Sequence, residues 1–265
     1  MKILTFFMLF ITTVSLDAKE YYAKVEPYEL NIISSNVAGE VMFVDEERLG
    51  EKLTSKPFIV IDAAIDKQDL NATKEKIAAI EAMYKADEEI IKNLQESLAR
   101  KKQNYERIKD LSIKSKTQKD TIYFDLIATK NQLLATKKEQ SNFSSQLSDL
   151  HVKQARLKKL LQDKTVTAKG YVLYELLVKK SQVVAPSTPL AKVANISKAV
   201  LSVYVDKNEL ENIKNKVLYI DSKPTPYTSI RVNYIADSVN ISTYKVQVVL
   251  PAPAIFSQLV KVEFK

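Results

Sequence analysis

The sequence predicts an elongated α+β protein in which a long antiparallel α-helical hairpin interrupts β-rich segments. Three observations support this fold class. The middle of the chain, 66–164, carries heptad repeats and contains neither glycine nor proline. Segments rich in valine, isoleucine and leucine flank it on both sides, and the last third alternates short apolar stretches with prolines. A chain of 265 residues has room for two or three small domains.

The composition excludes several functional classes. The chain has only 3 glycines, so it does not suit nucleotide-binding folds that cradle phosphates with glycine-rich loops. It has no cysteine, which excludes disulfides, thiolate metal sites, a cysteine nucleophile and lipidation of an N-terminal cysteine. The net charge is +8, but lysines alternate with acids through the middle of the chain, which indicates a solvated helix surface.

Residues 1–18 are predicted to form an export signal. Lys2 precedes an apolar run of 14 residues, 3–16, and Ala18 offers a cleavage site. The run is shorter than the roughly 20 residues that span a bilayer, so it fits a signal peptide better. We expect a mature chain that begins near Lys19 outside the cytoplasm, with an uncleaved inner-membrane anchor as the alternative.

The helical hairpin is predicted from heptads in two segments, about 66–111 and 119–163. One seam of the first segment is apolar or aromatic throughout: Leu70, Ile77, Tyr84, Ile91, Leu98 and Tyr105. Its second seam is interrupted by Asp87 and Lys101. The second segment has matching seams that start at Ile122 and Leu126. Only 112–118 separate the two segments, so the helices are antiparallel neighbours, each roughly 65–70 Å long.

A repeat flanks this hairpin, in 31–65 and 165–196. Five pairs share one offset of 131 positions: Gly39 with Gly170, Val41 with Val172, Gly50 with Ser181, Leu53 with Val184 and Ile59 with Leu190. Each copy reads as short strands separated by turn residues. We therefore expect two halves of one β-domain.

The segment 197–265 is predicted to form a small β-barrel. Strands are expected at 199–205, 216–220, 228–236, 244–250 and 259–264, with prolines between them. Asp206 is expected to cap a short helix that ends near Ile213. The first mature segment, 19–30, is expected to return to this barrel as its first strand.

Two half-motifs split by a helical hairpin resemble the lipoyl-like (barrel-sandwich hybrid) domain of the membrane fusion proteins of the HlyD family. The segment 181–191, SQVVAPSTPLA, is similar to the family stretch GdVVspGtPLa. Ser181 and Ser187 stand where glycine is usual, so we expect altered left-handed turns there. Gly39, Gly50, Gly170 and Ser181 mark the turns of this domain. We expect no bound cofactor, because the halves are separated and present no acceptor lysine in a tight turn.

The resemblance implies a periplasmic adaptor of a tripartite efflux pump. Such a protein is not an enzyme. It links an inner-membrane transporter to an outer-membrane channel of the TolC type and assembles as a ring, a hexamer in this family, that helps to seal a conduit. The alternatives are a type I secretion adaptor and a periplasmic coiled-coil scaffold. The signal-like start and short rod favour efflux, and an exported chain would not meet nucleic acid.

The resemblance also places channel docking at the hairpin tip. The family has a spaced Arg, Leu and Ser there, followed five residues later by Asp. Ser115 and Asp120 have that spacing, and Ile108 occupies the leucine position. Asn104 stands at the arginine position, although Arg107 is near. The candidate docking residues are Arg107, Ile108, Leu111, Ser115 and Asp120.

Two alternatives at the tip remain open. The segment 117–120 has the pattern of a helix capping box, and Ser115 could equally be the cap. Lys114, Lys116 and Lys119 could steer the tip towards an acidic channel rim or only solvate the loop.

No catalytic or metal-binding constellation is predicted. His151 is the only histidine and falls on the second helix, where a surface position is usual. With no cysteine, and with Met42 and Met83 as the only methionines after the signal, the chain lacks the ligands of a soft-metal relay.

Overall fold

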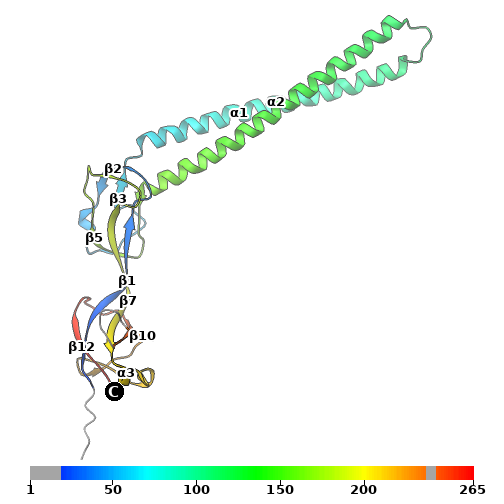
Figure 1. The fold of residues 1–265 in the computed structure, drawn as a ribbon. Coiled ribbons are helices and arrows are strands. Elements are labelled where there is room, and N and C mark those ends of the chain that lie inside the picture. The colour runs from blue at the N-terminus through cyan, green and yellow to red at the C-terminus, as the bar shows by residue number, and fades with distance from the viewer. Residues whose placement is uncertain (1–18, 237–242) are drawn as a thin grey trace, which may run out of the picture.

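A computed structural model of the chain describes residues 19–236 and 243–265. The molecule is elongated, with a helical hairpin at one end, a small β-unit at its base, and a larger β-domain at the other end (Figure 1). This arrangement confirms the predicted α+β class with a long hairpin and antiparallel sheets. The predicted signal, 1–18, lies outside the described residues.

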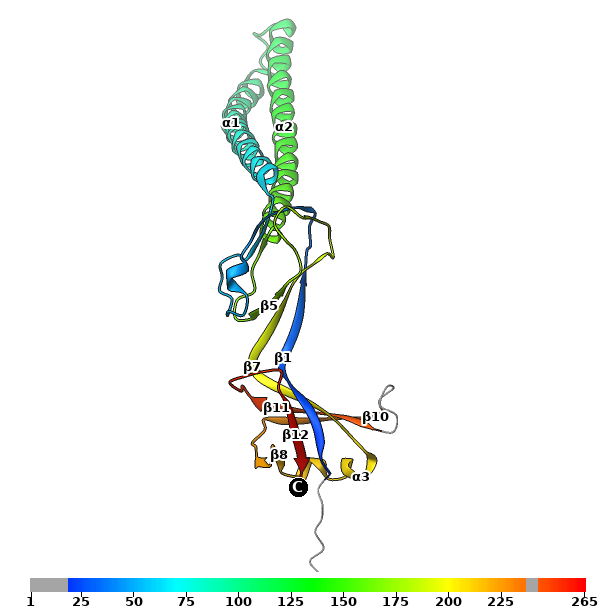
Figure 2. The ribbon, with the colours of Figure 1, turned by 90° about the vertical axis from the view of Figure 1, so that its left-hand side faces the viewer.

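The hairpin consists of α1 (Ala64–Ile108) and α2 (Lys116–Asp163), which lie side by side and antiparallel (Figures 1 and 2). The helices have 45 and 48 residues, so each is about 70 Å long. None of the residues at the predicted heptad seams is exposed, which confirms the register. Helix α1 begins two residues earlier than expected because Asp62 accepts a hydrogen bond from the Ala64 backbone N–H (3.0 Å).

Two polar residues in the seam have different surroundings. The ammonium of Lys101 donates to Asp125 Oδ1 and to Thr129 Oγ1, both at 2.8 Å. Asp87 is 8% exposed, and among the described residues its Oδ2 has no hydrogen-bond partner. A buried oxygen without a partner costs free energy, so Asp87 weakens the isolated hairpin.

The base of the hairpin is fixed to the adjacent β-unit. Lys164, directly after α2, forms an ion pair with Asp66 in the first turn of α1, and both side chains are largely buried. The Lys164 carbonyl accepts from the backbone N–H of Ile61 (2.8 Å). These contacts tie both helices to one strand.

The small β-unit is built around a four-stranded sheet in the order β4-β3-β2-β6. Its strands are β4 (Thr165–Val166), β3 (Ile59–Ile61), β2 (Gly39–Val44) and β6 (Val183–Val184). The unit also contains the short 3-10 helix η1 (Glu46–Arg48) and strand β5 (Val172–Leu176). Strand β5 pairs with β7 (Pro189–Val205), which in turn pairs with β1 (Tyr21–Ser34).

The two copies of the repeat exchange backbone pairing. Gly39 of the first copy pairs with Val184 of the second. In the reciprocal position, Gly170 of the second copy donates to the carbonyl of Leu53 in the first (3.0 Å). Side chains from both copies fill one core, in which Ile59 and Leu190 are fully buried. Each half therefore depends on the other for its hydrogen bonds and its core.

The turns of this unit keep the left-handed conformation. Gly50 and Gly170 have φ of 82° and 92°, and Ser181 and Ser187 have φ of 66° and 70°. The expectation of altered turns at the two serines is wrong. Backbone bonds hold both in place, because Ser181 N–H donates to Val41 and Ser187 N–H donates to Ser35 (both 2.7 Å).

The larger β-domain belongs to the second sheet, whose order is β10-β11-β7-β1-β12-β8-β9. Its further strands are β8 (Leu218–Ile220), β9 (Lys223–Pro224), β10 (Ser229–Ala236), β11 (Tyr244–Pro251) and β12 (Leu259–Phe264). The start of β1, Tyr21 to Lys24, pairs with β12, as expected for the first mature segment.

The predicted small β-barrel is not closed within the described residues. Among the described residues no ladder joins β9 to β10, which are the two edges of the sheet. Strand β9 has only two residues, and Pro224 and Pro226 interrupt the chain before β10. Proline has no N–H for a ladder, so the strand cannot extend to close the sheet.

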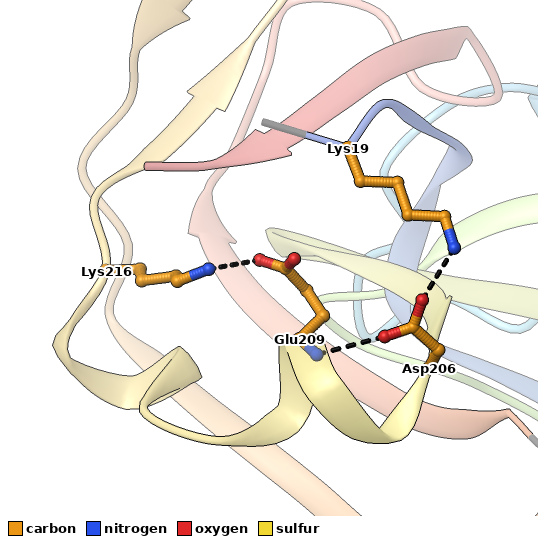
Figure 3. A network of polar contacts seen from close by, with 4 residues as sticks. All are labelled: Lys19, Asp206, Glu209 and Lys216. Carbon is orange, nitrogen blue, oxygen red and sulfur yellow. Dashed lines mark hydrogen bonds and ion pairs between the residues drawn. The ribbon is translucent and has the colours of Figure 1, made fainter. Parts of the chain in front are cut away.

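A short helical segment covers one end of this β-domain. Asp206 caps α3 (Lys207–Leu210) by accepting from the backbone N–H of Glu209 (3.0 Å), as predicted. The same carboxylate bonds the ammonium of Lys19 at 2.6 Å, and Glu209 pairs with Lys216 (Figure 3). The 3-10 helix η2 (Ile213–Asn215) follows, with Ile213 buried in the core.

Tyr21 lies beside this network. Burial, together with the negative charges of Asp206 and Glu209, raises the pKa of Tyr21 to about 12.

The described part of the chain contains no helix that combines the length and the apolar character needed to cross a bilayer.

Gly39→Ala is expected to destabilise the small β-unit. An added Cβ would lie 2.6 Å from Ile61 Cγ2, and such overpacking costs about 1–3 kcal/mol. The measurement is the free energy of unfolding by urea. The opposite kind of change, Ser181→Gly, should raise the free energy of unfolding by up to about 1 kcal/mol, because the backbone of Ser181 is left-handed and glycine adopts that conformation more easily. Equal stability of wild type and Gly39→Ala would contradict the close approach.

Asp87→Leu is expected to raise the melting temperature of the helical signal in circular dichroism. The change removes a buried oxygen without a partner and places an apolar side chain at that seam position, a gain of about 1–3 kcal/mol. Asp125→Leu is the matched control on the facing helix. It leaves the ammonium of Lys101 without its ion pair and should lower the melting temperature or leave it unchanged.

Tyr21→Phe is expected to weaken the loss of stability at high pH. The folded chain holds the pKa of Tyr21 at about 12, whereas an unfolded tyrosine titrates near about 10. The stability that this group contributes is therefore complete below pH 10 and is lost as pH rises towards 12. Urea unfolding at several alkaline pH values measures this. Tyr22→Phe, at the exposed neighbour, should behave like wild type.

Candidate functional site at the hairpin tip

The hairpin tip is a short turn whose backbone is closed by helix caps. Helix α1 ends at Ile108, and the next N–H, of Lys109, still bonds the Tyr105 carbonyl (3.0 Å). Helix α2 begins at Lys116, because Ser115 and Gln118 form a reciprocal capping box. Of the two caps that the sequence offered, Ser115 is therefore the one that forms, and the box at 117–120 is wrong. Helix α1 ends three residues before the expected 111, and α2 begins three residues before the expected 119.

This geometry separates the five candidate docking residues into two groups. Ser115 uses its hydroxyl to accept from the Gln118 backbone (3.2 Å), and Ile108 is only 9% exposed in the helix interface. Arg107, Leu111 and Asp120 are exposed. Ser115 is thus engaged with Gln118 in the helix cap, and Ile108 belongs to the seam.

The largest exposed apolar groups near the tip are absent from the candidates that the sequence pattern selects. Ile113 in the turn is 85% exposed, and Phe124 on α2 is 68% exposed. Tyr123 contacts Tyr105 across the hairpin with ring centroids 5.3 Å apart, and Phe124 extends this aromatic group. One signal was available in the sequence, since Phe124 is apolar yet stands outside both heptad seams.

The tip carries a positive charge. Between 107 and 120 there are five basic and two acidic side chains. Lys119 donates to the Lys109 carbonyl (2.9 Å) and so links the two helix ends. A hydrogen bond from Lys109 lowers the pKa of the Glu106 carboxyl and raises the pKa of Lys109 itself, so that pair stays ionised. An acidic surface would be attracted to the basic side chains that remain in solvent.

The four predicted turn residues of the small β-unit lie far along the molecule from this tip. Gly39, Gly50, Gly170 and Ser181 take part in the exchanged backbone pairing at the base of the hairpin. His151 is exposed on α2, and no group of three or more His, Cys, Asp or Glu residues in 19–236 and 243–265 is placed to hold a metal ion.

Comparison with known proteins identifies the fold. No family model matches the sequence, and no curated protein matches it. Among solved structures, MacA from Actinobacillus actinomycetemcomitans is similar with a TM-score of 0.66 and 17% identity, over 94% of this chain and 79% of that one. The match to ZneB from Cupriavidus metallidurans has a TM-score of 0.52 and 16% identity, over 93% and 97%.

A third similar structure is described as a membrane fusion protein. The membrane fusion protein Spr0693 from Streptococcus pneumoniae R6 matches with a TM-score of 0.56 and 11% identity, over 94% of this chain and 99% of that one. An elongated chain with a helical hairpin between two parts of a β-unit is therefore an architecture that solved proteins share. The chain has the fold of a membrane fusion protein.

Proposed function

We propose that the chain is a membrane fusion protein that acts as the periplasmic adaptor of a tripartite efflux pump and catalyses no reaction. The observation that carries the proposal is a rod about 70 Å long that ends in an exposed, basic and apolar turn. A rod of this kind connects two partners across a distance. The likeness to the membrane fusion protein Spr0693 supports the membrane fusion part of this proposal.

The polarity of the proposed adaptor follows from the ends of the molecule. The hairpin tip lies at one end and α3 lies at the other (Figure 1). Lys19, where the described chain begins, is bonded to Asp206, the residue that caps α3. In this proposal the tip meets an outer-membrane channel of the TolC type. The β-domain faces the inner-membrane transporter, and residues 1–18 serve as an export signal or an anchor.

The small β-unit is proposed to be a split lipoyl-like domain of the barrel-sandwich type. Its reciprocal pairing of Gly39 with Val184 and of Gly170 with Leu53 supports this assignment. In the proposal these units stack in a ring, a hexamer, and line a sealed conduit. Neighbouring hairpins in a ring would also support a helix pair that Asp87 weakens.

Photo-crosslinking in cells tests the docking end. A crosslinker at Ile113 or Phe124 is expected to form adducts with an outer-membrane channel, because both side chains are exposed near the tip. Val152 is the matched control, since it is an exposed apolar residue of α2 far from the tip. Adducts from Val152 alone, or none from the tip when the chain is exported, would favour a periplasmic scaffold.

A substitution in the tip separates docking from folding. Ile113→Asp should remove the adducts formed from Phe124 and leave the melting temperature unchanged, because Ile113 is 85% exposed. Val152→Asp should change neither result.

A further inference from the structure

The β-domain is covered at one end and open at the other. Strand β7 pairs with β11 from Val205, next to α3, to Lys198 at the far end of the ladder. At the α3 end, Leu210 and Ile213 pack against the core. Towards the far end, the buried core residues Val25, Leu250 and Val260 line a cavity of about 410 Å³. These three residues are 6–7% exposed, so the cavity reaches only the edge of the core.

The walls of this cavity are rigid and largely apolar. Three prolines line it, namely Pro251 at the end of β11, Pro253 just after that strand, and Pro226 between β9 and β10, and Ile220 and Ile255 add to the apolar lining. Proline fixes the backbone, so a ligand would enter a cavity that is already formed. The volume falls in the range of about 300–1,000 Å³ that is typical of small-molecule sites.

The polar groups at the mouth indicate the charge of the ligand. Asp221 lines the cavity, and its Oδ1 accepts from the backbone N–H of Lys261 (2.9 Å). Lys223 also lines the cavity, and none of the ion pairs found in the described parts of the chain involves it. An ammonium beside an apolar cavity favours a ligand with an anionic group at the mouth.

We propose that this cavity binds a small amphiphile that has an apolar body and an anionic head group. The body would replace solvent over Val25, Leu250 and Val260, and the head would pair with Lys223. The concave shape and the polar residues at the rim, Asp221, Thr225 and Gln258, suit a small molecule better than a flat protein surface. The site is independent of hairpin docking, since it lies in the β-domain at the other end of the molecule (Figure 1).

Two fluorescent naphthalene dyes test the proposal on the full chain. One is the anionic 8-anilinonaphthalene-1-sulfonate and the other is the neutral N-phenyl-1-naphthylamine. We expect saturable binding of both at one site per chain, with the anionic dye bound more tightly. The readout is the dissociation constant from fluorescence titration, with stoichiometry from calorimetry.

Three variants locate the site. Ile255→Asp places a carboxylate at the mouth and should weaken both dyes about ten-fold; because Ile255 is 61% exposed, the fold should persist. Lys223→Ala should weaken the anionic dye about three-fold and leave the neutral dye unchanged. Leu259→Asp is the control, an exposed aliphatic residue four positions away that does not line the cavity.

The control decides the interpretation. Unchanged binding in Leu259→Asp, together with the losses in the other variants, supports the site. Equal losses in Leu259→Asp, or the absence of saturable binding by the wild-type chain, would overturn the proposal. Retained affinity for the anionic dye in Lys223→Ala would overturn the anionic head group.

Discussion

The ladder between β1 and β7 is the constraint on which the rest of the structure depends. These strands have 14 and 17 residues, and together they pass through both the small β-unit and the β-domain. Strand β7 also pairs with β5 in the first and with β11 in the second. Because one pair of strands serves both units, the molecule is long, and the hairpin and α3 lie at opposite ends (Figure 2).

The small β-unit fixes where the hairpin begins and ends. Both helices leave it within a few residues of strands that pair with each other, β3 before α1 and β4 after α2. The ion pair between Lys164 and Asp66 closes the base, and the capping box of Ser115 closes the tip. A rod held at both ends can present a small surface at a fixed distance. Its surface for a partner then consists of the side chains that the two caps leave free.

Particular residues show where sequence reasoning succeeds and where it fails. The heptad register is predictable because each seam position repeats the same local burial, from Leu70 to Leu157. The left-handed conformation of Ser181 and Ser187 is not predictable in this way, because it is held by backbone hydrogen bonds to the distant residues Val41 and Ser35. The open sheet was missed for a similar reason, since closure depends on how far β9 can extend against β10.

The sequence by itself determined the rod, the duplicated β-segments around it and the cap at Asp206, because heptads, repeats and capping residues act over short distances along the chain. Only the tertiary structure decided which side chains remain available. Ser115 is engaged in a cap and Ile108 is buried in the seam, while Ile113 and Phe124 stay exposed. The cavity beside Lys223 likewise arises where loops from separate parts of the chain meet, since exposure is a property of the packed molecule and not of a local pattern.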